Sequence, residues 1–438
     1  MIFSSDSNVF KGAQTSMTMM GATLPYVYTS ARDEYLAGRE SAWLGITLNV
    51  TPIYVLSGPD AATLLNRVCV NRDFSLMQEG MSKHALICNE NGHLIADGVI
   101  MKEEGTVYRT YWLAPVLEYY VTTSGLDVQG TYVQDEYFFQ IDGPKSLEIL
   151  EEATQTDLHD IKFAKNKKVQ ICGTEMTVHR LGMSGCLAYE VHGKAEYGEK
   201  VYTKIRDVLE SYGGRPQGIG SYGIINHTTA GYPNQMQHFL YPYEECNPEL
   251  GAFMKQRSMP LTPYGSNSDY IEDYYVYPYD IGWGYLINYN HDFIGKEALL
   301  KVKSNQPRKV ITLEWNADDV ADVFASNFRG KDVEPYDSIE TPTDGDMIHM
   351  LLRGDQVLKN GQKIGMAVGR TWAYYERRMI SLAYIKPEFA IEGEEVVVLW
   401  GDKGHRQKEI RAKVAPFPYY NGDFRNETFD TEKIPRRF

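Results

Sequence analysis

Two stretches in the first half of the chain share one pattern of apolar and polar positions. In each, an alternating or aromatic-rich strand ends at a Gly-Pro turn, and leucines at helical spacing follow. The strands and turns cover residues 54–59 and 138–144, and the helices begin near Ala61 and Ser146. The repeat predicts two similar α+β halves built on antiparallel sheets. The alternative is a chance recurrence of a common turn dipeptide.

Other patterns complete the predicted order of elements. Residues 83–100 predict a hairpin around Asn91-Gly92, residues 169–191 a second meander, and residues 195–209 a helix. After Pro307, short β-rich runs alternate with Gly, Asn and Asp turns, as in a small all-β barrel domain. These runs cover residues 309–314, 362–369, 379–384, 394–400 and 409–414. The predicted domains are residues 1–135, 136–305 and 306–438.

The stretch 279–299 has a more local signature. Asp292, an apolar pair, Gly295 and good helix formers follow one another. This order predicts a strand that runs into a turn and a capped helix.

Length, charge and cysteine content narrow the class of protein. A chain of 438 residues predicts roughly three domains. The formal net charge of −14 disfavours nucleic acid and anionic membranes as partners. No apolar run approaches the about 18–20 residues of a membrane span, and residues 1–20 do not resemble a signal peptide. The five cysteines are scattered and form no CxxC pair, which predicts reduced thiols in the cytoplasm and no zinc site.

Common catalytic motifs are absent from the sequence. It contains no HExxH, P-loop or GxSxG motif, and no GxGxxG that opens a helix after a strand. The ten histidines are dispersed, without metal-ligand spacing on a clear face. Hydrolase, kinase, dehydrogenase and metalloenzyme functions are therefore disfavoured, and no metal is predicted.

Two carboxylates occupy positions that call for an explanation. Asp97 is a lone acid in an apolar strand, where it needs either an edge position, with its side chain facing solvent, or a partner. Glu190 follows a glycine-rich turn that lets backbone approach a ligand, and a carboxylate can accept two hydrogen bonds from an amidine-like heterocycle. An exposed strand glutamate is the alternative for Glu190.

These stretches together resemble the folate-dependent aminomethyltransferases of the glycine cleavage system and their relatives. The similarity runs from about residue 40 to about residue 418, with the motifs in the family's order. The matching stretches are residues 92–100 (GHLIADGVI), 182–191 (GMSGCLAYEV), 280–299 (DIGWGYLINYNHDFIGKEAL), 364–368 (IGMAV) and 381–385 (SLAYI).

The resemblance implies a ring of two α+β domains and a β-barrel, with tetrahydrofolate in a central funnel. It implies that Glu190 holds the amino-pyrimidine edge of the pterin and that Asp97 lies near the reacting N5 and N10 atoms. Gln140 and Trp283 are expected in the same pocket. The candidates for the folate glutamate tail are Arg370, Arg377 and Arg378.

The subfamily is a separate question. Residues 226–231 (NHTTAG) lack the arginine that glycine cleavage enzymes carry there, which disfavours an aminomethyl-lipoyl substrate. Residues 271–275 (IEDYY), 278–280 (PYD) and 416–420 (PFPYY) resemble the tetrahydrofolate-dependent aryl O-demethylases that act on vanillate and syringate. The histidine expected near residues 47–50 and the arginine expected around residues 111–113 are absent, so a different methoxy compound is expected.

The predicted function is an O-demethylase that moves a methyl group from a small-molecule methoxy donor, aromatic by resemblance, to N5 of tetrahydrofolate. The leaving ether oxygen needs an acid. Tyr241 is the first choice, with His238 and Tyr243 as competitors, although packing beside Pro242 also explains Tyr241. The predicted substrate-binding residues are Tyr26, Tyr28, Tyr243 and Trp112.

Other functions stay open on the sequence alone. A sulfonium, betaine or methylamine demethylase and an aminomethyltransferase use the same scaffold, and a sulfonium or betaine donor would need only an aromatic box. A folate-binding regulator without catalysis is the alternative from another class. The sequence does not decide between a monomer and a homo-oligomer.

Overall fold

The first half of the chain is built on a five-stranded antiparallel sheet with strand order β5-β6-β7-β4-β8. The computed structural model describes residues 3–4, 6–344 and 350–438. The predicted hairpin is confirmed: the Asn89 N–H donates to the His93 carbonyl, and Gly92 has φ +84°. The elements are β4 (Ile53–Ser57), α2 (Ala61–Val68), β5 (Ser82–Cys88), β6 (Leu94–Lys102), β7 (Tyr108–Tyr111), α3 (Val116–Thr123) and β8 (Gln129–Val133).

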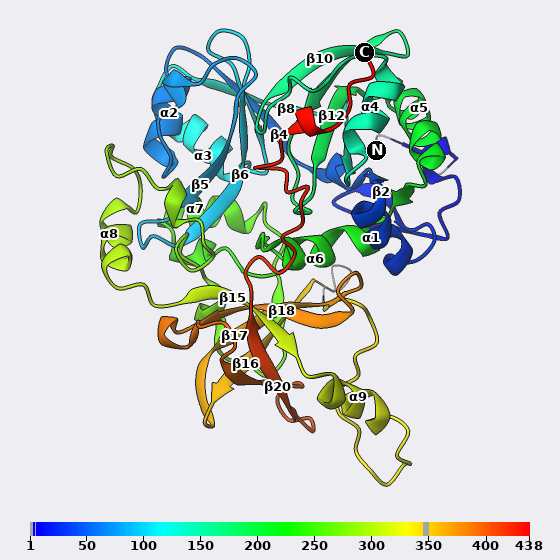
Figure 1. Ribbon diagram of the computed structural model, residues 1–438. Coiled ribbons are helices and arrows are strands. Elements are labelled where there is room, and N and C mark those ends of the chain that lie inside the picture. Colours follow the sequence, from blue (N-terminus) through cyan, green and yellow to red (C-terminus); the bar gives the residue numbers. More distant parts are fainter. Residues whose placement is uncertain (1–2, 5, 345–349) are drawn as a thin grey trace.

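A six-stranded sheet with order β10-β11-β12-β9-β3-β13 forms the second half, beside the first (Figure 1). The predicted meander and helix are confirmed as β10–β12 and α5. Strand β3 precedes the first sheet in the chain but pairs with β9 and β13. The predicted domain boundary at residue 135 stays a prediction. Strand pairing places residues 43–45, which precede that boundary, in the second sheet. The elements are β3 (Trp43–Gly45), β9 (Glu136–Asp142), α4 (Ser146–Thr154), β10 (Asn166–Ile171), β11 (Thr174–His179), β12 (Ala188–Lys194), α5 (Gly198–Ser211) and β13 (Arg215–Gln217).

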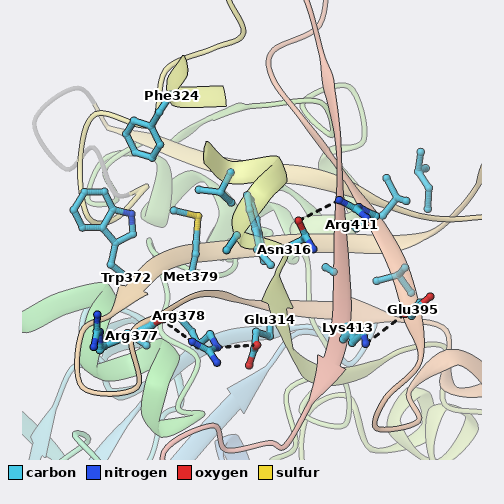
Figure 2. A pocket seen from close by; sticks show the side chains of 18 of the residues that line it. Glu314, Asn316, Phe324, Trp372, Arg377, Arg378, Met379, Glu395, Arg411 and Lys413 are labelled. Carbon is cyan, nitrogen blue, oxygen red and sulfur yellow. Dashed lines mark hydrogen bonds and ion pairs between the residues drawn. The ribbon is translucent and has the colours of Figure 1, made fainter. Parts of the chain in front are cut away.

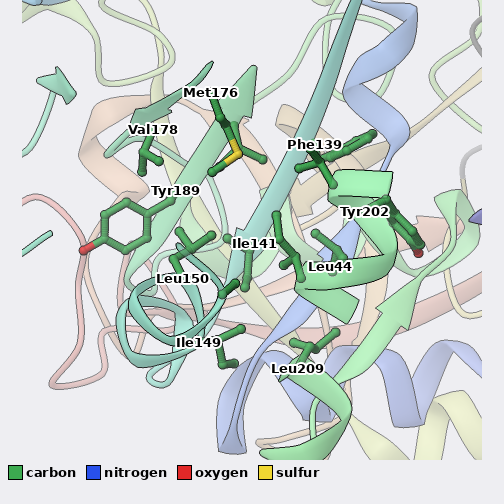
Figure 3. Packing of buried hydrophobic residues seen from close by; sticks show 14 of the residues in the cluster. Leu44, Phe139, Ile141, Ile149, Leu150, Met176, Val178, Tyr189, Tyr202 and Leu209 are labelled. Carbon is green, nitrogen blue, oxygen red and sulfur yellow. The ribbon is translucent and has the colours of Figure 1, made fainter. Parts of the chain in front are cut away.

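Alternation along the second sheet separates two faces. Phe139, Ile141, Val178 and Tyr189 point into a hydrophobic core that also receives Leu209 of α5 (Figure 3). The residues between them point to the opposite face, which lies on the side of the first half. Because this opposite face is buried as well, its polar residues need hydrogen-bond partners or a ligand.

The predicted repeat is confirmed at its turns. Gly58, between β4 and α2, has φ +134°, and Gly143, between β9 and α4, has φ +136°. A Cβ atom would lie 2.4 Å from the Asp127 carbonyl oxygen at Gly58, and 2.3 Å from the Ser41 carbonyl oxygen at Gly143. Both turns therefore need glycine for the same two reasons, backbone conformation and close approach of another chain segment.

The third sheet closes into a six-stranded barrel below the two halves (Figure 1). Pairing of β16 with β19 completes the ring β16-β17-β18-β15-β20-β19, and β14 adds to β16 from outside. The predicted barrel is confirmed, but its pattern did not reveal α9 or β16. The elements are β14 (Thr262–Tyr264), β15 (Lys309–Trp315), α9 (Ala317–Ser326), β16 (Leu351–Lys359), β17 (Gln362–Ala373), β18 (Arg378–Ile385), β19 (Glu395–Trp400) and β20 (Lys408–Ala415).

The predicted strand before residue 292 is wrong, whereas the helix after it is confirmed. Residues 279–294 form turns and a short 3₁₀ segment, and α8 (Lys296–Ser304) begins after Gly295, which has φ +83°. Asp292 does not cap this helix; its carboxylate is exposed and lies 3.0 Å from Lys296. A Cβ at Gly295 would lie 2.4 Å from the Asn89 carbonyl oxygen. The motif therefore packs the start of α8 against the β5–β6 hairpin.

Strands β1 (Thr15–Met19) and β2 (Ala22–Val27) pair with each other as a separate two-stranded sheet. The other α-helices are α1 (Ala31–Glu40), α6 (Ile219–Ala230) and α7 (Pro248–Lys255). The chain after Pro416 returns from the barrel to the second half, where Arg180 donates to Asn426. Within the described ranges, no helix has the length and apolar character that a bilayer crossing requires. The cytoplasmic location stays a prediction.

Candidate active site

The buried polar face of the second sheet gathers residues from three neighbouring strands. Glu190 of β12 lies opposite Gln140 of β9 on one side and opposite His179 of β11 on the other. Glu190 is 6% exposed and Gln140 is 1% exposed, so the exposed-glutamate alternative is excluded. The two residues that the sequence assigns to one pocket are direct neighbours.

Asp142, which sequence reasoning missed, completes this group. The Gln140 amide nitrogen donates to Asp142 Oδ2 over 3.2 Å, and the Asp142 side chain is fully buried. Burial raises the pKa of the Asp142 carboxyl well above its ordinary value, and the nearby charge of Glu190 raises it further. The site thus pairs two carboxyl groups, of which Asp142 favours the protonated form and becomes able to donate a hydrogen bond.

Several buried polar atoms on this face point to a ligand. Considering only the described parts of the chain, Gln140 Oε1, Asp142 Oδ1, both ring nitrogens of His179 and the Tyr222 hydroxyl have no hydrogen-bond partner. A Cβ at Gly182 would lie 3.2 Å from both Asp142 Oδ1 and the Gln140 amide nitrogen, so the glycine leaves these groups uncovered. Carboxyl and amide groups in this arrangement suit the donor and acceptor edge of a pterin.

The same face has a second property that the sequence spacing did not reveal. Ligand atoms of His179, Glu190 and His192 lie within 4.8 Å of one another, and all three side chains are buried. Two imidazoles and a carboxylate are ligands that a divalent metal accepts. A metal at this position would occupy the Glu190 carboxylate, which the sequence assigns to the pterin.

Tyr241 and Asp97, predicted separately from the sequence, are in direct contact. The Tyr241 hydroxyl donates to Asp97 Oδ1 over 2.5 Å and accepts the Asp97 backbone N–H over 3.0 Å. Asp97 therefore has the partner that its place in an apolar strand calls for. Burial raises the pKa of Tyr241 well above its ordinary value, and the adjacent Asp97 carboxylate raises it further. The Tyr241 hydroxyl keeps its proton over the whole physiological range.

The hydrogen-bonded chain continues through His84, a residue that the sequence did not single out. His84 Nε2 lies 3.3 Å from Asp97 Oδ2, and His84 Nδ1 lies 3.1 Å from the Tyr232 hydroxyl. Trp283 is buried, and its ring packs edge-on against His84 at 4.7 Å between centroids. The Trp283 indole therefore supports the His84 ring, and its predicted role in cofactor binding stays a prediction.

His238 and Tyr243, the competitors of Tyr241, have different surroundings. The His238 ring accepts the Asn234 backbone N–H at Nδ1 over 3.1 Å, and its Nε2 lies 2.9 Å from the Thr228 hydroxyl. Burial lowers the pKa of His238 to about 3. With both ring nitrogens engaged, His238 orders the loop that leads to Tyr241. The Tyr243 ring lies beside Tyr241, at 5.8 Å between centroids.

Of the other predicted substrate-binding residues, Tyr26 and Tyr28 belong to the segment before β3, whereas Trp112 follows Tyr111, which pairs with Val99 on the strand of Asp97. The Tyr28 hydroxyl donates to the Val9 carbonyl oxygen over 2.6 Å inside the second half. Tyr26 is 41% exposed and Trp112 is 39% exposed. Among the contacts of the described residues, none joins these three side chains to Tyr241 or Asp97. Their role in binding a donor stays a prediction.

The three arginines that are candidates for binding the folate glutamate tail have different surroundings. Arg370 is buried, and its Nε donates to Asp344 Oδ1 over 2.6 Å, so its charge is already paired. Arg377 and Arg378 line a groove of about 1270 Å³ on the outside of the barrel (Figure 2). Arg378 is paired with Glu314 over 3.0 Å. The assignment of Arg377 and Arg378 stays a prediction.

Comparison with known proteins decides the family. The family model of the GCVT N-terminal domain matches residues 6–233. The chain belongs to the GCVT family. A sesamin methylene transferase from Sinomonas sp. (strain No.22) is 43% identical to it over 428 residues, which is 94% of each chain. A syringate O-demethylase from Sphingobium sp. is 28% identical and covers 91% of each chain.

Further relatives of this GCVT-family chain agree with its fold. An aminomethyltransferase from Thermotoga maritima is 25% identical over 93% of this chain and 94% of its own length. The crystal structure of glycine cleavage system aminomethyltransferase T from Bartonella henselae superposes with a TM-score of 0.67 at 15% identity, over 94% of this chain and 96% of that one. The predicted family, the fold class, an enzyme and tetrahydrofolate as its cofactor are confirmed.

Proposed function

We propose that this GCVT-family enzyme takes a one-carbon group from the ether oxygen of an aromatic donor and transfers it to tetrahydrofolate. The observation that carries the proposal is the 2.5 Å hydrogen bond from the Tyr241 hydroxyl to Asp97 Oδ1. It fixes a protonated phenol and a carboxylate at one place, half-buried and therefore within reach of a ligand. Ether cleavage needs such an acid, because an unprotonated aryl oxide is a poor leaving group.

Glu190, Gln140 and Asp142 would hold the pterin edge. Ionised Glu190 accepts hydrogen bonds from the amino-pyrimidine, while Asp142, with its raised pKa, can donate one, and Gln140 offers one of each kind. Tetrahydrofolate, when bound, supplies the nucleophilic nitrogens that accept the one-carbon group. The residues of the chain orient donor and acceptor and exclude water around them.

Tyr241 and Asp97 have complementary roles at the reacting carbon. With the donor bound, the Tyr241 hydroxyl would turn its hydrogen from Asp97 Oδ1 to the departing aryl oxygen, and the Asp97 carboxylate would stabilise positive charge that develops as the C–O bond lengthens. Asp97 also takes up a proton that leaves the acceptor nitrogen. The bond from the Asp97 backbone N–H holds the Tyr241 oxygen in place, so only the hydroxyl hydrogen has to turn during the reaction.

Two kinds of aromatic donor are candidates. Sesamin carries methylenedioxyphenyl groups, in which one carbon bridges two aryl oxygens, and syringate carries methoxy groups. The relative named for sesamin is 43% identical and the one named for syringate is 28% identical, which favours a methylenedioxy donor. Methyl transfer from a methoxyarene, predicted from the sequence, is the second candidate.

A donor panel tests the proposal. Purified enzyme and tetrahydrofolate are incubated with methylenedioxyarenes, matched methoxyarenes, a sulfonium, a betaine and a methylamine. The products 5,10-methylenetetrahydrofolate and 5-methyltetrahydrofolate are then measured, with Asp97→Asn as the inactive control. Aryl ethers alone are expected to react. Transfer from only the sulfonium, betaine or amine overturns the donor class, and folate binding without any transfer favours the regulator.

A further inference from the structure

Four side chains form one continuous hydrogen-bonded chain with a tyrosine hydroxyl at each end. Tyr241 donates to Asp97 over 2.5 Å, Asp97 lies 3.3 Å from His84, and His84 lies 3.1 Å from Tyr232. We call Tyr241, Asp97, His84 and Tyr232 the proton chain. Its members come from β5, β6 and the segment after α6, so three separate pieces of the fold converge on it.

The proton chain is built to touch a ligand as well as to hold the fold. All four side chains are half-buried, so each keeps some accessible surface. Burial raises the pKa of Tyr232 well above its ordinary value, and the carboxylates of Asp97 and Glu190 add to the shift. Ring contacts through His227 join Tyr232 to Tyr222, which lies on the same face as Glu190; the centroids are 6.2 Å and 6.3 Å apart. Both terminal hydroxyls therefore stay protonated.

His84 can pass a proton between the two ends. A histidine ring holds one or two protons, and its two nitrogens here face Asp97 and Tyr232. When both nitrogens are protonated, the ring donates to Asp97 and to the Tyr232 oxygen, which leaves the Tyr232 hydrogen free for another acceptor. Tyr285, Glu427 and His227 also lie near Tyr232; the Nδ1 of His227 lies 2.8 Å from the Tyr232 carbonyl oxygen, and burial lowers its pKa to about 4. His227 is therefore neutral and does not compete for the proton.

The two kinds of donor differ in how many oxygens must be protonated. With a methoxyarene, one C–O bond breaks, one C–N bond forms and one N–H proton ends on the phenol oxygen. With a methylenedioxyarene, two C–O bonds break, two C–N bonds form at N5 and N10, and the two N–H protons end on the two catechol oxygens. Neither reaction changes the oxidation state of the carbon. Only the second reaction needs acids at two oxygens.

We propose that His84 and Tyr232 form a second proton path, so that Tyr241 protonates one oxygen of a methylenedioxyarene and Tyr232 protonates the other. The inference rests on the proposed function and narrows it to donors with two adjacent ether oxygens. Asp97 collects the protons released at the acceptor nitrogens, and His84 carries one of them to Tyr232. A single tyrosine would suffice for a methoxyarene.

Turnover of two matched donors tests the second path. Wild type, Tyr232→Phe and His84→Gln are compared on a methylenedioxyarene and on the methoxyphenol with the same ring. Both variants are expected to lower kcat for the methylenedioxyarene about 100-fold and to change kcat for the methoxyphenol less than threefold. Tyr375→Phe, which removes a hydroxyl from a half-exposed tyrosine on the barrel, is the matched control. Equal losses on both donors overturn the second path and leave the proposed function standing.

A binding measurement without folate distinguishes a failure of the second proton path from a failure of the proposed one-carbon transfer. 4-Nitrocatechol imitates the two-oxygen product, and its absorption spectrum reports ionisation of the bound molecule; 4-nitroguaiacol, with one oxygen methylated, is the comparison. Tyr232→Phe is expected to weaken nitrocatechol binding about tenfold and nitroguaiacol binding much less. Equal weakening overturns the inference even if wild type transfers no carbon at all. A melting curve for each variant confirms that it is folded, and His84→Gln provides a second readout if Tyr232→Phe is unstable.

Discussion

The Tyr241 hydroxyl is bound between two groups of a single residue, Asp97, which lies 144 positions earlier in the chain. It donates to the side-chain carboxylate and accepts the backbone N–H of the same residue. Because both partners belong to one strand, the hydroxyl oxygen is held in place, whereas its hydrogen can turn from Asp97 to another acceptor at the loss of one bond. The contact also links a loop after α6 to the middle of β6.

Replacing Tyr241 by phenylalanine removes the acid and keeps the ring. Turnover of an aryl ether is expected to fall about 10²–10⁴-fold, because the leaving oxygen departs without a proton. Steady-state kinetics and titration of tetrahydrofolate check this. Folate affinity should change little, since Tyr241 does not contribute to the pterin-binding face. Full turnover in Tyr241→Phe would assign the acid role to another group.

Replacing Glu190 by glutamine tests the pterin pocket. The amide keeps the shape but loses the charge that accepts the amino-pyrimidine donors, so the Kd for tetrahydrofolate is expected to rise at least about tenfold. Isothermal titration calorimetry measures this change. Glu175→Gln is the control, because Glu175 is exposed on the neighbouring strand and pairs with Lys168. Equal affinities in both variants would remove Glu190 from the pocket. Weaker tetrahydrofolate binding by the wild type in the presence of Zn²⁺ would favour a metal on this face.

The elements that sequence patterns predicted are those whose signals are local. The hairpin at Asn89–Gly92, the repeat around Gly58 and Gly143, and the helix after Gly295 each depend on a glycine in a left-handed or extended positive-φ conformation. The barrel strands were predictable from the alternation of apolar and polar residues along them. By contrast, β3 has only three residues, and its place in the second sheet depends on partners far along the chain. No local pattern contains that information.

His84 illustrates why part of the site was not predictable. The hairpin register shifts between Ile87 and Cys88, so one strand contains an extra residue. Counting back from the turn without this bulge would pair Ala85 with Asp97 and turn His84 to the opposite face. With the bulge, Leu86 opposes Asp97, and His84 shares its face. Asp97 and Glu190 were recognisable through family motifs, whereas His84 and Asp142 are placed by register and burial alone.

Substituting Gly143 tests whether the repeat needs glycine for packing as well as for conformation. Gly143→Ala combines φ +136° with a Cβ atom 2.3 Å from the Ser41 carbonyl oxygen, and it is expected to cost about 3 kcal/mol or more. Gly173→Ala is the control, because its φ is +77° and nothing lies within 4 Å of the added Cβ; about 1–2 kcal/mol is expected. Urea unfolding of both variants measures the difference. Equal costs would mean that Ser41 moves freely out of the way.

The stability of the tail that returns to the second half should depend on pH through His159. This ring is fully buried; its Nδ1 lies 2.8 Å from Glu151 Oε1 and its Nε2 lies 3.0 Å from the Ile434 carbonyl oxygen. Because a carbonyl and a carboxylate only accept, both nitrogens carry protons. Burial opposes the charged ring, but the Ile434 carbonyl and Glu151 outweigh it and raise the pKa of His159 above its ordinary value.

The folded state therefore binds the His159 proton more tightly than the unfolded state. Its stabilising effect is complete below about pH 6 and is lost as the pH rises through the folded pKa. The melting temperature of wild type should exceed that of His159→Gln most at about pH 6, and the gap should narrow towards about pH 9. His405→Gln, on an exposed imidazole paired with Asp337, should show a much smaller gap throughout, since solvent screens that pair. A gap for His159→Gln that is constant from about pH 6 to about pH 9 would mean that the buried ring is neutral and that packing alone holds the tail.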